Sequence, residues 1–278
     1  MRYALTVWTL LLLLMMMSAA SSAAERLPAT LSVTLGDSVQ RYTVDELLAR
    51  HDATSITVPD DVSYGRTMLY RAVPFLALLG DSAAGKFDTL EVKASDGFAS
   101  QLPLELVRKG AAGGSVAWLA VEDPREPWPD LPSKQTSAGP LYLVWQYPER
   151  SGIGSEQWPY AVASITAVAS PALRWPQMTV AETLPADALA RHGQKVFTVQ
   201  CMPCHRMKGA GVSDVGPDLG APMSPTQYLT PLGLRALIRD PIAVRTWPDQ
   251  RMPAFNESKL SDADLDALIA YLGHMAER

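Results

Sequence analysis

The feature that most restricts how this chain can fold is a short motif in its C-terminal third, Cys201-Met202-Pro203-Cys204-His205. The chain has two cysteines in 278 residues, and both lie in this motif. A disulfide between residues three apart closes too small a loop to stabilise a fold much. On one helical turn, by contrast, both thiols and the imidazole can point to the same side. We therefore expect the cysteines to serve chemistry rather than a structural crosslink.

Cys-x-x-Cys-His is the spacing that attaches a c-type haem. The thiols of Cys201 and Cys204 would reach the vinyl groups at one haem edge, and His205 would bind the iron. The alternatives are a disulfide and a thioredoxin-like redox pair. The pair ends a predicted helix instead of following a strand, which disfavours both alternatives. The sequence therefore predicts one covalent haem c with His205 as an axial ligand.

The first residues have the layout of a secretory signal. Arg2 precedes an apolar run over residues 4–17, and small residues follow to Ala24. We expect a signal peptide over residues 1–24, cleaved after Ala24, and hence a periplasmic protein. The alternative is an uncleaved membrane anchor, because one arginine is a thin basic region. The apolar run is shorter than the roughly 20 residues that a spanning helix needs.

The remaining chain divides into two regions by pattern. Residues 25–170 are rich in short strand-like runs separated by turn residues, and two short helices are predicted at 43–50 and 74–79. This pattern is typical of an α+β domain. The predicted strands are residues 31–35, 55–58, 89–94, 116–121, 141–145 and 161–168.

A proline-containing linker over residues 171–186 precedes a helical region over residues 187–278. Helices are predicted at 187–200, at 226–240 with its end at Pro241, and from Ser261 to the C-terminus. In the last helix Leu265, Leu268, Ile269 and Leu272 recur with the spacing of one buried face. We therefore expect an all-α domain in this region.

Composition narrows the class of function. Apolar residues make up 47% and charged residues 19%, which is typical of a globular protein. The net charge is −5, and we expect no nucleic-acid partner because such binding needs a basic face. Residues 25–179 hold most of the acidic excess, 18 acidic against 13 basic side chains.

Several further segments have the order and spacing found in single-haem class I cytochrome c domains, and the C-terminal region resembles that family. The resemblance covers the last ninety or so residues. Besides the cysteine motif, it rests on Gly193-x-x-x-Phe197, Gly216-Pro217-Asp218-Leu219, Arg251-Met252-Pro253-Ala254-Phe255, Leu260-Ser261-Asp262 and Tyr271-Leu272.

Met252 is the expected second axial ligand of the haem iron. It lies 47 residues after His205 (252 − 205), in a loop beside Pro253 and before the last helix. The alternative is that Met252 fills a gap in the core, as methionines often do. The iron would then be bis-histidine or five-coordinate. The weaker candidates for this ligand are Met202, Met207, Met223, Met275 and His274.

The resemblance implies supporting roles for other residues. The carbonyl of Pro217 would accept the second ring N–H of His205 and orient the imidazole. Arg245, Trp247 and Arg251 would contact haem propionates, or else are solvated loop residues. Packing roles are also implied: Gly193 and Phe197 would meet the terminal helix near Tyr271.

The N-terminal region contains four segments of turn and core residues with a family likeness: residues 70–75 with Leu78-Leu79, and residues 94–98, 118–120 and 139–144. Through these segments it resembles a small form of the sulfite-oxidase-type molybdopterin-binding fold. That family holds molybdenum through a cysteine thiolate, and residues 25–170 contain no cysteine. We therefore expect no molybdenum cofactor there. His51 is expected at the surface, Asp96-Gly97 is expected in a tight turn, and the domain would serve as a docking platform.

The resulting prediction is a periplasmic mono-haem c-type cytochrome. It would pass electrons from a dehydrogenase to another cytochrome or an oxidase. The alternative is a haem-containing molybdopterin-type oxidoreductase, or its haem subunit, acting on a small substrate such as sulfite. A haem-based sensor is a third hypothesis. The sequence favours electron transfer over enzyme activity and leaves the question open.

Overall fold

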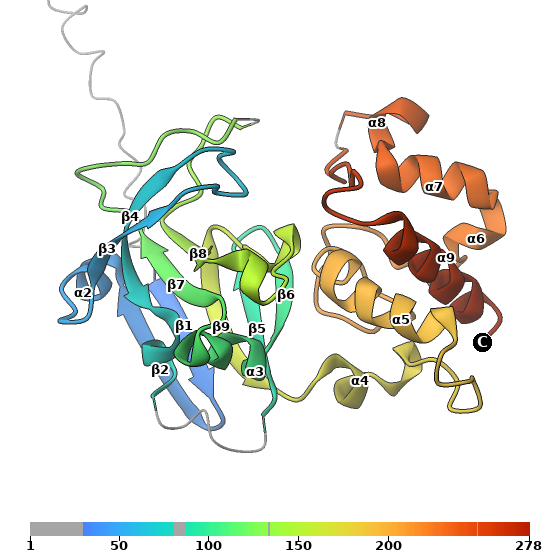
Figure 1. Cartoon of the computed structure of the whole chain (residues 1–278), viewed down its shortest axis with the longest axis horizontal. Coiled ribbons are helices and arrows are strands. Elements are labelled where there is room, and N and C mark those ends of the chain that lie inside the picture. The colour runs from blue at the N-terminus through green and yellow to red at the C-terminus, as the bar shows by residue number, and fades with distance from the viewer. Residues whose placement is uncertain (1–29, 81–86, 133, 249) are drawn as a thin grey trace, which may run out of the picture.

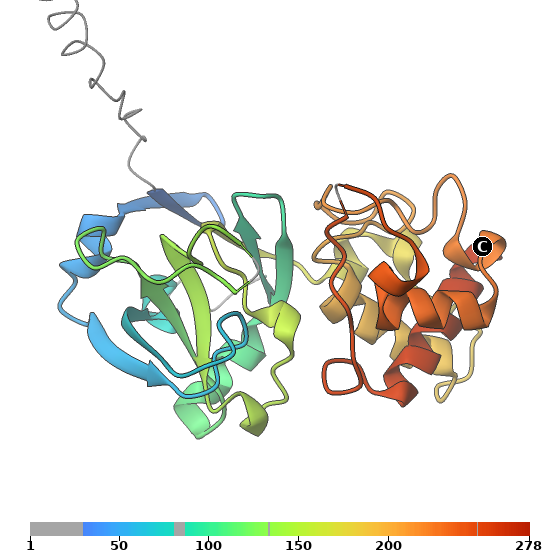
Figure 2. The same cartoon turned by 90° about the horizontal axis from the view of Figure 1, so that it is seen from above.

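The computed structural model describes residues 30–80, 87–132, 134–248 and 250–278. The expected signal peptide, residues 1–24, lies outside the described residues. Figure 1 shows a strand-rich N-terminal domain and a helical C-terminal domain lying side by side, and the view from above in Figure 2 agrees. The expected strand-rich and helical regions are therefore confirmed.

The N-terminal domain contains a five-stranded and a four-stranded sheet. The strand order is β2-β1-β9-β5-β6 in the first and β3-β4-β7-β8 in the second. All neighbouring strands are antiparallel except β1 and β9. The strands are β1 Thr30–Leu35, β2 Ser38–Thr43, β3 Thr54–Val58, β4 Met68–Pro74, β5 Thr89–Ala94, β6 Ala99–Pro103, β7 Val116–Val121, β8 Leu141–Gln146 and β9 Val162–Val168.

All six predicted strands are present, and three further strands were missed. β2 is mostly exposed and carries no alternating apolar pattern. β6 follows the Asp96-Gly97 turn, and its run is only five residues long. The predicted short helices are α2 (Val44–Leu48) and a 3₁₀ turn at Phe75–Leu78. A further short helix, α3 (Leu104–Arg108), follows β6.

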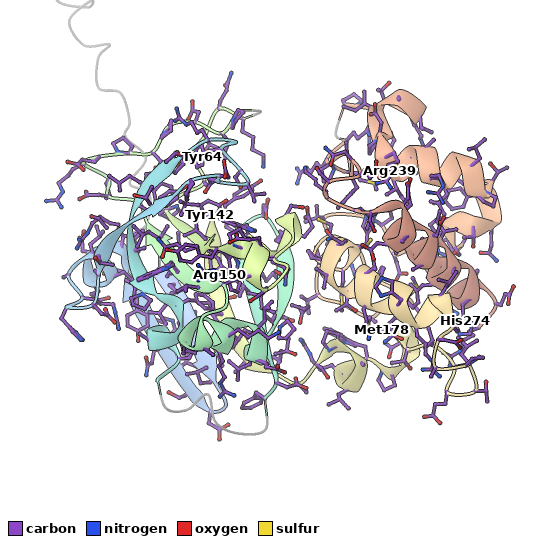
Figure 3. All side chains as sticks on the ribbon, viewed as in Figure 1. Tyr64, Tyr142, Arg150, Met178, Arg239 and His274 are labelled. Carbon is purple, nitrogen blue, oxygen red and sulfur yellow. The ribbon has the colours of Figure 1, made fainter. Side chains whose placement is uncertain are left out.

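The two sheets enclose one apolar core, and Asp61 is the carboxylate that lies inside it among the residues that the structure describes. Asp61 accepts hydrogen bonds from the backbone amides of Ser63 and Tyr64 and from the hydroxyl of Tyr70 at 2.8 Å. Tyr142 also donates to it, at 3.3 Å. Figure 3 labels Tyr64 and Tyr142 in the upper half of this domain. These bonds offset the cost of burying the carboxylate.

The helical domain begins with α5 (Leu189–Val196), which continues into a π-helical turn at Phe197–Cys201. The last helix, α9 (Asp262–Ala276), begins after Ser261, whose hydroxyl accepts a hydrogen bond from the Asp264 amide. Its expected buried face is confirmed, since Leu265, Leu268 and Leu272 are buried and Ile269 is half-buried.

The prediction of one helix over residues 226–240 is wrong. The segment forms α6 (Pro225–Tyr228) and α7 (Pro231–Arg239), and a third short helix, α8 (Pro241–Val244), follows. Thr230 is extended because it lies directly before Pro231, and the proline then occupies the first turn of a new helix. Asp240 is likewise extended before Pro241.

The crossing of α5 and α9 organises this domain. A β-carbon at Gly193 would lie 1.9 Å from the carbonyl oxygen of Ala267, so only glycine permits this approach. The rings of Phe197 and Tyr271 pack with their centroids 5.3 Å apart. Gly193 and Phe197 therefore meet α9 near Tyr271, as expected.

The stretch between the domains has structure of its own. It contains α4 (Pro171–Arg174) and a 3₁₀ turn at Pro176–Met178. Arg174 forms an ion pair with Glu91 of β5, while the carbonyl of Met178 accepts a 2.7 Å hydrogen bond from the Tyr271 hydroxyl. Figure 3 labels Met178 beneath α5. This stretch therefore contacts both domains.

Among the described residues, no helix combines the length and apolarity needed to cross a membrane.

Candidate haem-attachment site

The cysteine motif continues the helix that leads into it. Cys201 ends the π-helical turn. Its carbonyl accepts hydrogen bonds from the amides of Cys204 at 3.1 Å and His205 at 2.8 Å. Both thiols are free and half-buried. The two sulfurs and the imidazole are thus carried by one compact helical turn.

The imidazole of His205 is held against the loop that follows the motif. Its Nδ1 lies 2.8 Å from the carbonyl oxygen of Pro217. The loop is drawn close because the amide of Gly216 donates to the Cys204 carbonyl at 2.8 Å. A β-carbon at Gly216 would lie 2.4 Å from Cε1 of His205. A glycine is therefore required for the ring to lie flat against the loop.

Asp218 fixes that loop in place, a role that the sequence analysis did not assign. Its carboxylate accepts hydrogen bonds from the backbone amides of Lys208 at 2.9 Å, Gly209 at 2.6 Å and Gly220 at 2.7 Å. Lys208 has a positive φ of 51°, which costs energy for a residue with a side chain. The three bonds to Asp218 stabilise this conformation and with it the position of the Pro217 carbonyl.

Burial keeps the motif in its uncharged forms. It raises the pKa of Cys204 to about 12 and raises the pKa of Cys201 as well. Burial also lowers the pKa of His205, and the hydrogen bond to Pro217 partly opposes this. A neutral imidazole with one nitrogen bonded to a carbonyl leaves the other nitrogen free to act as a ligand.

Met252 lies half-buried against the same apolar cluster as Cys201. Two buried amide atoms near these residues have no hydrogen-bond partner: Oε1 of Gln200, next to Cys201, and Nε2 of Gln250, two residues before Met252. Both could bond to polar atoms of a bound group. Among the described residues, one more buried side-chain atom has no hydrogen-bond partner, Nε1 of Trp158.

The three residues proposed to contact propionates are exposed. The guanidinium of Arg245 lies 4.8 Å from the ring centroid of Trp247, just after α8, and Arg251 follows in the loop leading to Met252. The structure therefore brings Arg245 and Trp247 together and leaves Arg251 solvated. Their contact with a haem stays a prediction.

The sequence analysis missed the part of the site that comes from the N-terminal domain. The amide of Ala99 on β6 donates a 2.9 Å hydrogen bond to the carbonyl of Pro203, inside the motif. The two partners lie 104 positions apart in the sequence (203 − 99), so no local spacing could have predicted the contact. His51 is exposed and Asp96-Gly97 forms a tight turn, both as expected.

One family model matches the chain. It describes subunit III of the cbb3-type cytochrome c oxidase, and it matches residues 188–272. No curated protein matches the chain. The match covers less than a third of the sequence and shows that the C-terminal region is a cytochrome c domain. Such a domain implies haem c and a role in electron transfer.

The residues present fit a haem. The two free thiols lie on the same helical turn as His205. The Pro217 carbonyl orients the His205 ring, and Gly216 leaves room for that ring because it has no side chain. Cys201 and Cys204 would hold the porphyrin covalently, and His205 would bind its iron. Met252 stays the expected second ligand.

Proposed function

We propose that this protein is a periplasmic mono-haem cytochrome that passes electrons between redox partners. The donor would be a dehydrogenase and the acceptor another cytochrome or an oxidase. The haem, when bound, supplies a one-electron Fe(III)/Fe(II) couple. The observation that carries the proposal is the motif itself, folded as one helical turn with its imidazole hydrogen-bonded to Pro217.

Residues of this chain would orient the iron ligands and set the reduction potential of the Fe(III)/Fe(II) couple. The Pro217 carbonyl fixes the orientation of His205 and strengthens the imidazole as a ligand. Asp218 holds that carbonyl through the surrounding backbone. A thioether from Met252 would favour the reduced iron and raise the potential. If His205 and Met252 both bind the iron, no position would remain open for substrate.

The ligand assignment can be tested with one substitution and one control. The ferric wild-type holoprotein is expected to show the weak methionine-to-iron charge-transfer band in its visible spectrum. Met252→Ala should abolish the band and let the ferrous protein bind carbon monoxide. Met223→Ala removes a methionine that is 50% exposed and should leave both properties unchanged. Persistence of the band in Met252→Ala would disprove the assignment.

Within this proposal, the N-terminal domain is a cofactor-free relative of the sulfite-oxidase-type fold that serves as a docking platform. The alternative is a molybdenum oxidoreductase in which this domain passes electrons to the haem. The hydrogen bond between Ala99 and Pro203 joins the two domains next to the haem motif, which suits electron transfer from one domain to the other. Elemental analysis separates the two hypotheses, because one molybdenum per chain would support the enzyme.

A further inference from the structure

The N-terminal domain covers one side of the haem-attachment motif. Apart from the bond between Ala99 and Pro203, the 3₁₀ turn at Ser155–Gln157 packs against the π-helical turn that ends at Cys201. A β-carbon at Gly154 would lie 3.0 Å from Nε2 of Gln200. Figures 1 and 2 both show β5 and β6 at the side of the N-terminal domain that faces the helical domain.

Two carboxylates of the N-terminal domain act on the motif from this side. After burial, the charge of Glu156 is the largest cause that raises the pKa of both Cys201 and Cys204. The charge of Asp96 raises the pKa of Cys204 as well. Geometry places both acids at the motif: Glu156 belongs to the turn that packs against the π-helical turn ending at Cys201. A β-carbon at Gly97, next to Asp96, would lie 3.7 Å from Cγ2 of Val215, in the loop between His205 and Pro217.

The charge of these two groups is not neutralised by a close partner. Within the described residues, neither Glu156 nor Asp96 takes part in an ion pair. Ser155 donates a 3.1 Å hydrogen bond to Glu156, and Lys259 of the helical domain stabilises its charge at longer range. Asp96 is exposed and accepts a hydrogen bond from the Phe98 amide.

We propose that the N-terminal domain lowers the reduction potential of the haem by holding the carboxylates of Glu156 and Asp96 against the attachment edge. This inference rests on the proposed function. Oxidised haem carries one more positive charge than reduced haem, so a fixed negative charge nearby stabilises the oxidised form. Glu156 is half-buried and screened little by salt, whereas Asp96 is exposed and screened more.

The inference assigns a function to a domain that needs no cofactor of its own. The domain holds most of the chain's acidic excess, and it places two of these acids beside the attachment motif. The docked domain would be a permanent part of the haem environment. The potential would therefore depend on a domain that lies outside the family match.

The test is an equilibrium redox titration of full-length holoprotein with chemical mediators. Glu156→Gln keeps the acceptor for the Ser155 hydroxyl and removes the charge. At the midpoint potential of the wild type, Glu156→Gln should raise the ratio of reduced to oxidised haem about tenfold. This corresponds to a midpoint potential higher by ~59 mV for a one-electron couple. Asp96→Asn keeps the turn and should give a smaller shift that shrinks with added salt.

Two controls separate charge from packing. Asp45→Asn removes an exposed carboxylate from α2, which lies on the far side of the N-terminal domain in Figures 1 and 2, and should leave the potential unchanged. Glu156→Asp retains the charge and should retain most of the low potential. A shift in Glu156→Asp as large as that in Glu156→Gln would overturn the inference.

The failure of this inference differs from the failure of the proposed function. If Glu156→Gln and Asp96→Asn carry an intact haem and titrate at the wild-type potential, the inference is wrong and the electron-transfer function stands. If the wild-type chain, made in a cell competent in cytochrome maturation, carries no titratable haem, the proposed function and the inference both fall.

Discussion

The backbone amide of Ala99 donates a 2.9 Å hydrogen bond to the carbonyl of Pro203, which lies between the two cysteines of the motif. Ala99 belongs to β6, which forms one edge of the five-stranded sheet. Edge strands present unpaired backbone groups that must find partners. Here the partner is the motif itself, so the N-terminal domain is joined to the haem site through its backbone.

Removing this donor should loosen the domain contact. Ala99→Pro eliminates the N–H and leaves the Pro203 carbonyl unsatisfied, which should cost about 1–3 kcal/mol of unfolding free energy. Urea unfolding of the holoprotein, followed by haem absorbance, measures the loss. Ala99→Gly keeps the N–H and is the matched control. Equal midpoints for the two variants would contradict the role of the bond.

The crossing of α5 and α9 gives a second prediction. Gly193→Ala would place a β-carbon 1.9 Å from the Ala267 carbonyl oxygen, so the helices must separate. We expect a loss of ~3 kcal/mol in unfolding free energy. Gly273→Ala on α9 meets nothing within 4 Å and should instead stabilise the domain by roughly 0.5–1 kcal/mol. Thermal or denaturant unfolding of both variants tests the contrast.

Much of this fold is encoded locally and could be predicted from the sequence. The motif at Cys201, the cap at Ser261 and the apolar face of α9 each lie within a few residues, so spacing alone locates them. β2 and β6 were missed because they lack an apolar pattern, and their pairing partners specify them instead. The break at Pro231 was a local signal that the prediction of a continuous helix overlooked.

The site was predicted less completely than the fold around it. The turn that carries Cys204 and His205 follows from sequence spacing. The hydrogen bonds to Asp218 and the packing of the turn that holds Glu156 could not be predicted in this way, because they depend on loops and domains that meet only after folding. Long-range contacts of this kind carry no periodicity in the sequence.

Gly216 gives a prediction about the haem ligand itself. A methyl group at this position would lie 2.4 Å from Cε1 of His205, so Gly216→Ala should displace the imidazole from the Pro217 carbonyl. The low-spin fraction of the ferric haem, measured by visible and paramagnetic resonance spectra, should fall. Pro217→Ala retains the backbone acceptor and should keep the wild-type spectrum. A low-spin Gly216→Ala spectrum identical to wild type would show that the ring tolerates the added methyl group.

The midpoint potential should also depend on pH through Glu156. Burial raises the pKa of this carboxyl above its ordinary value of 4.5, and the Ser155 hydroxyl and Lys259 partly oppose the shift. In the holoprotein the neighbouring Cys201 and Cys204 are thioethers and do not titrate. As the pH rises through the raised pKa, the proton leaves, the carboxylate stabilises oxidised haem, and the potential falls.

Redox titrations from about pH 4.5 upward should show this decline in wild type and in Asp96→Asn, and a flatter profile in Glu156→Gln. The same slope in all three proteins would place the titrating group elsewhere.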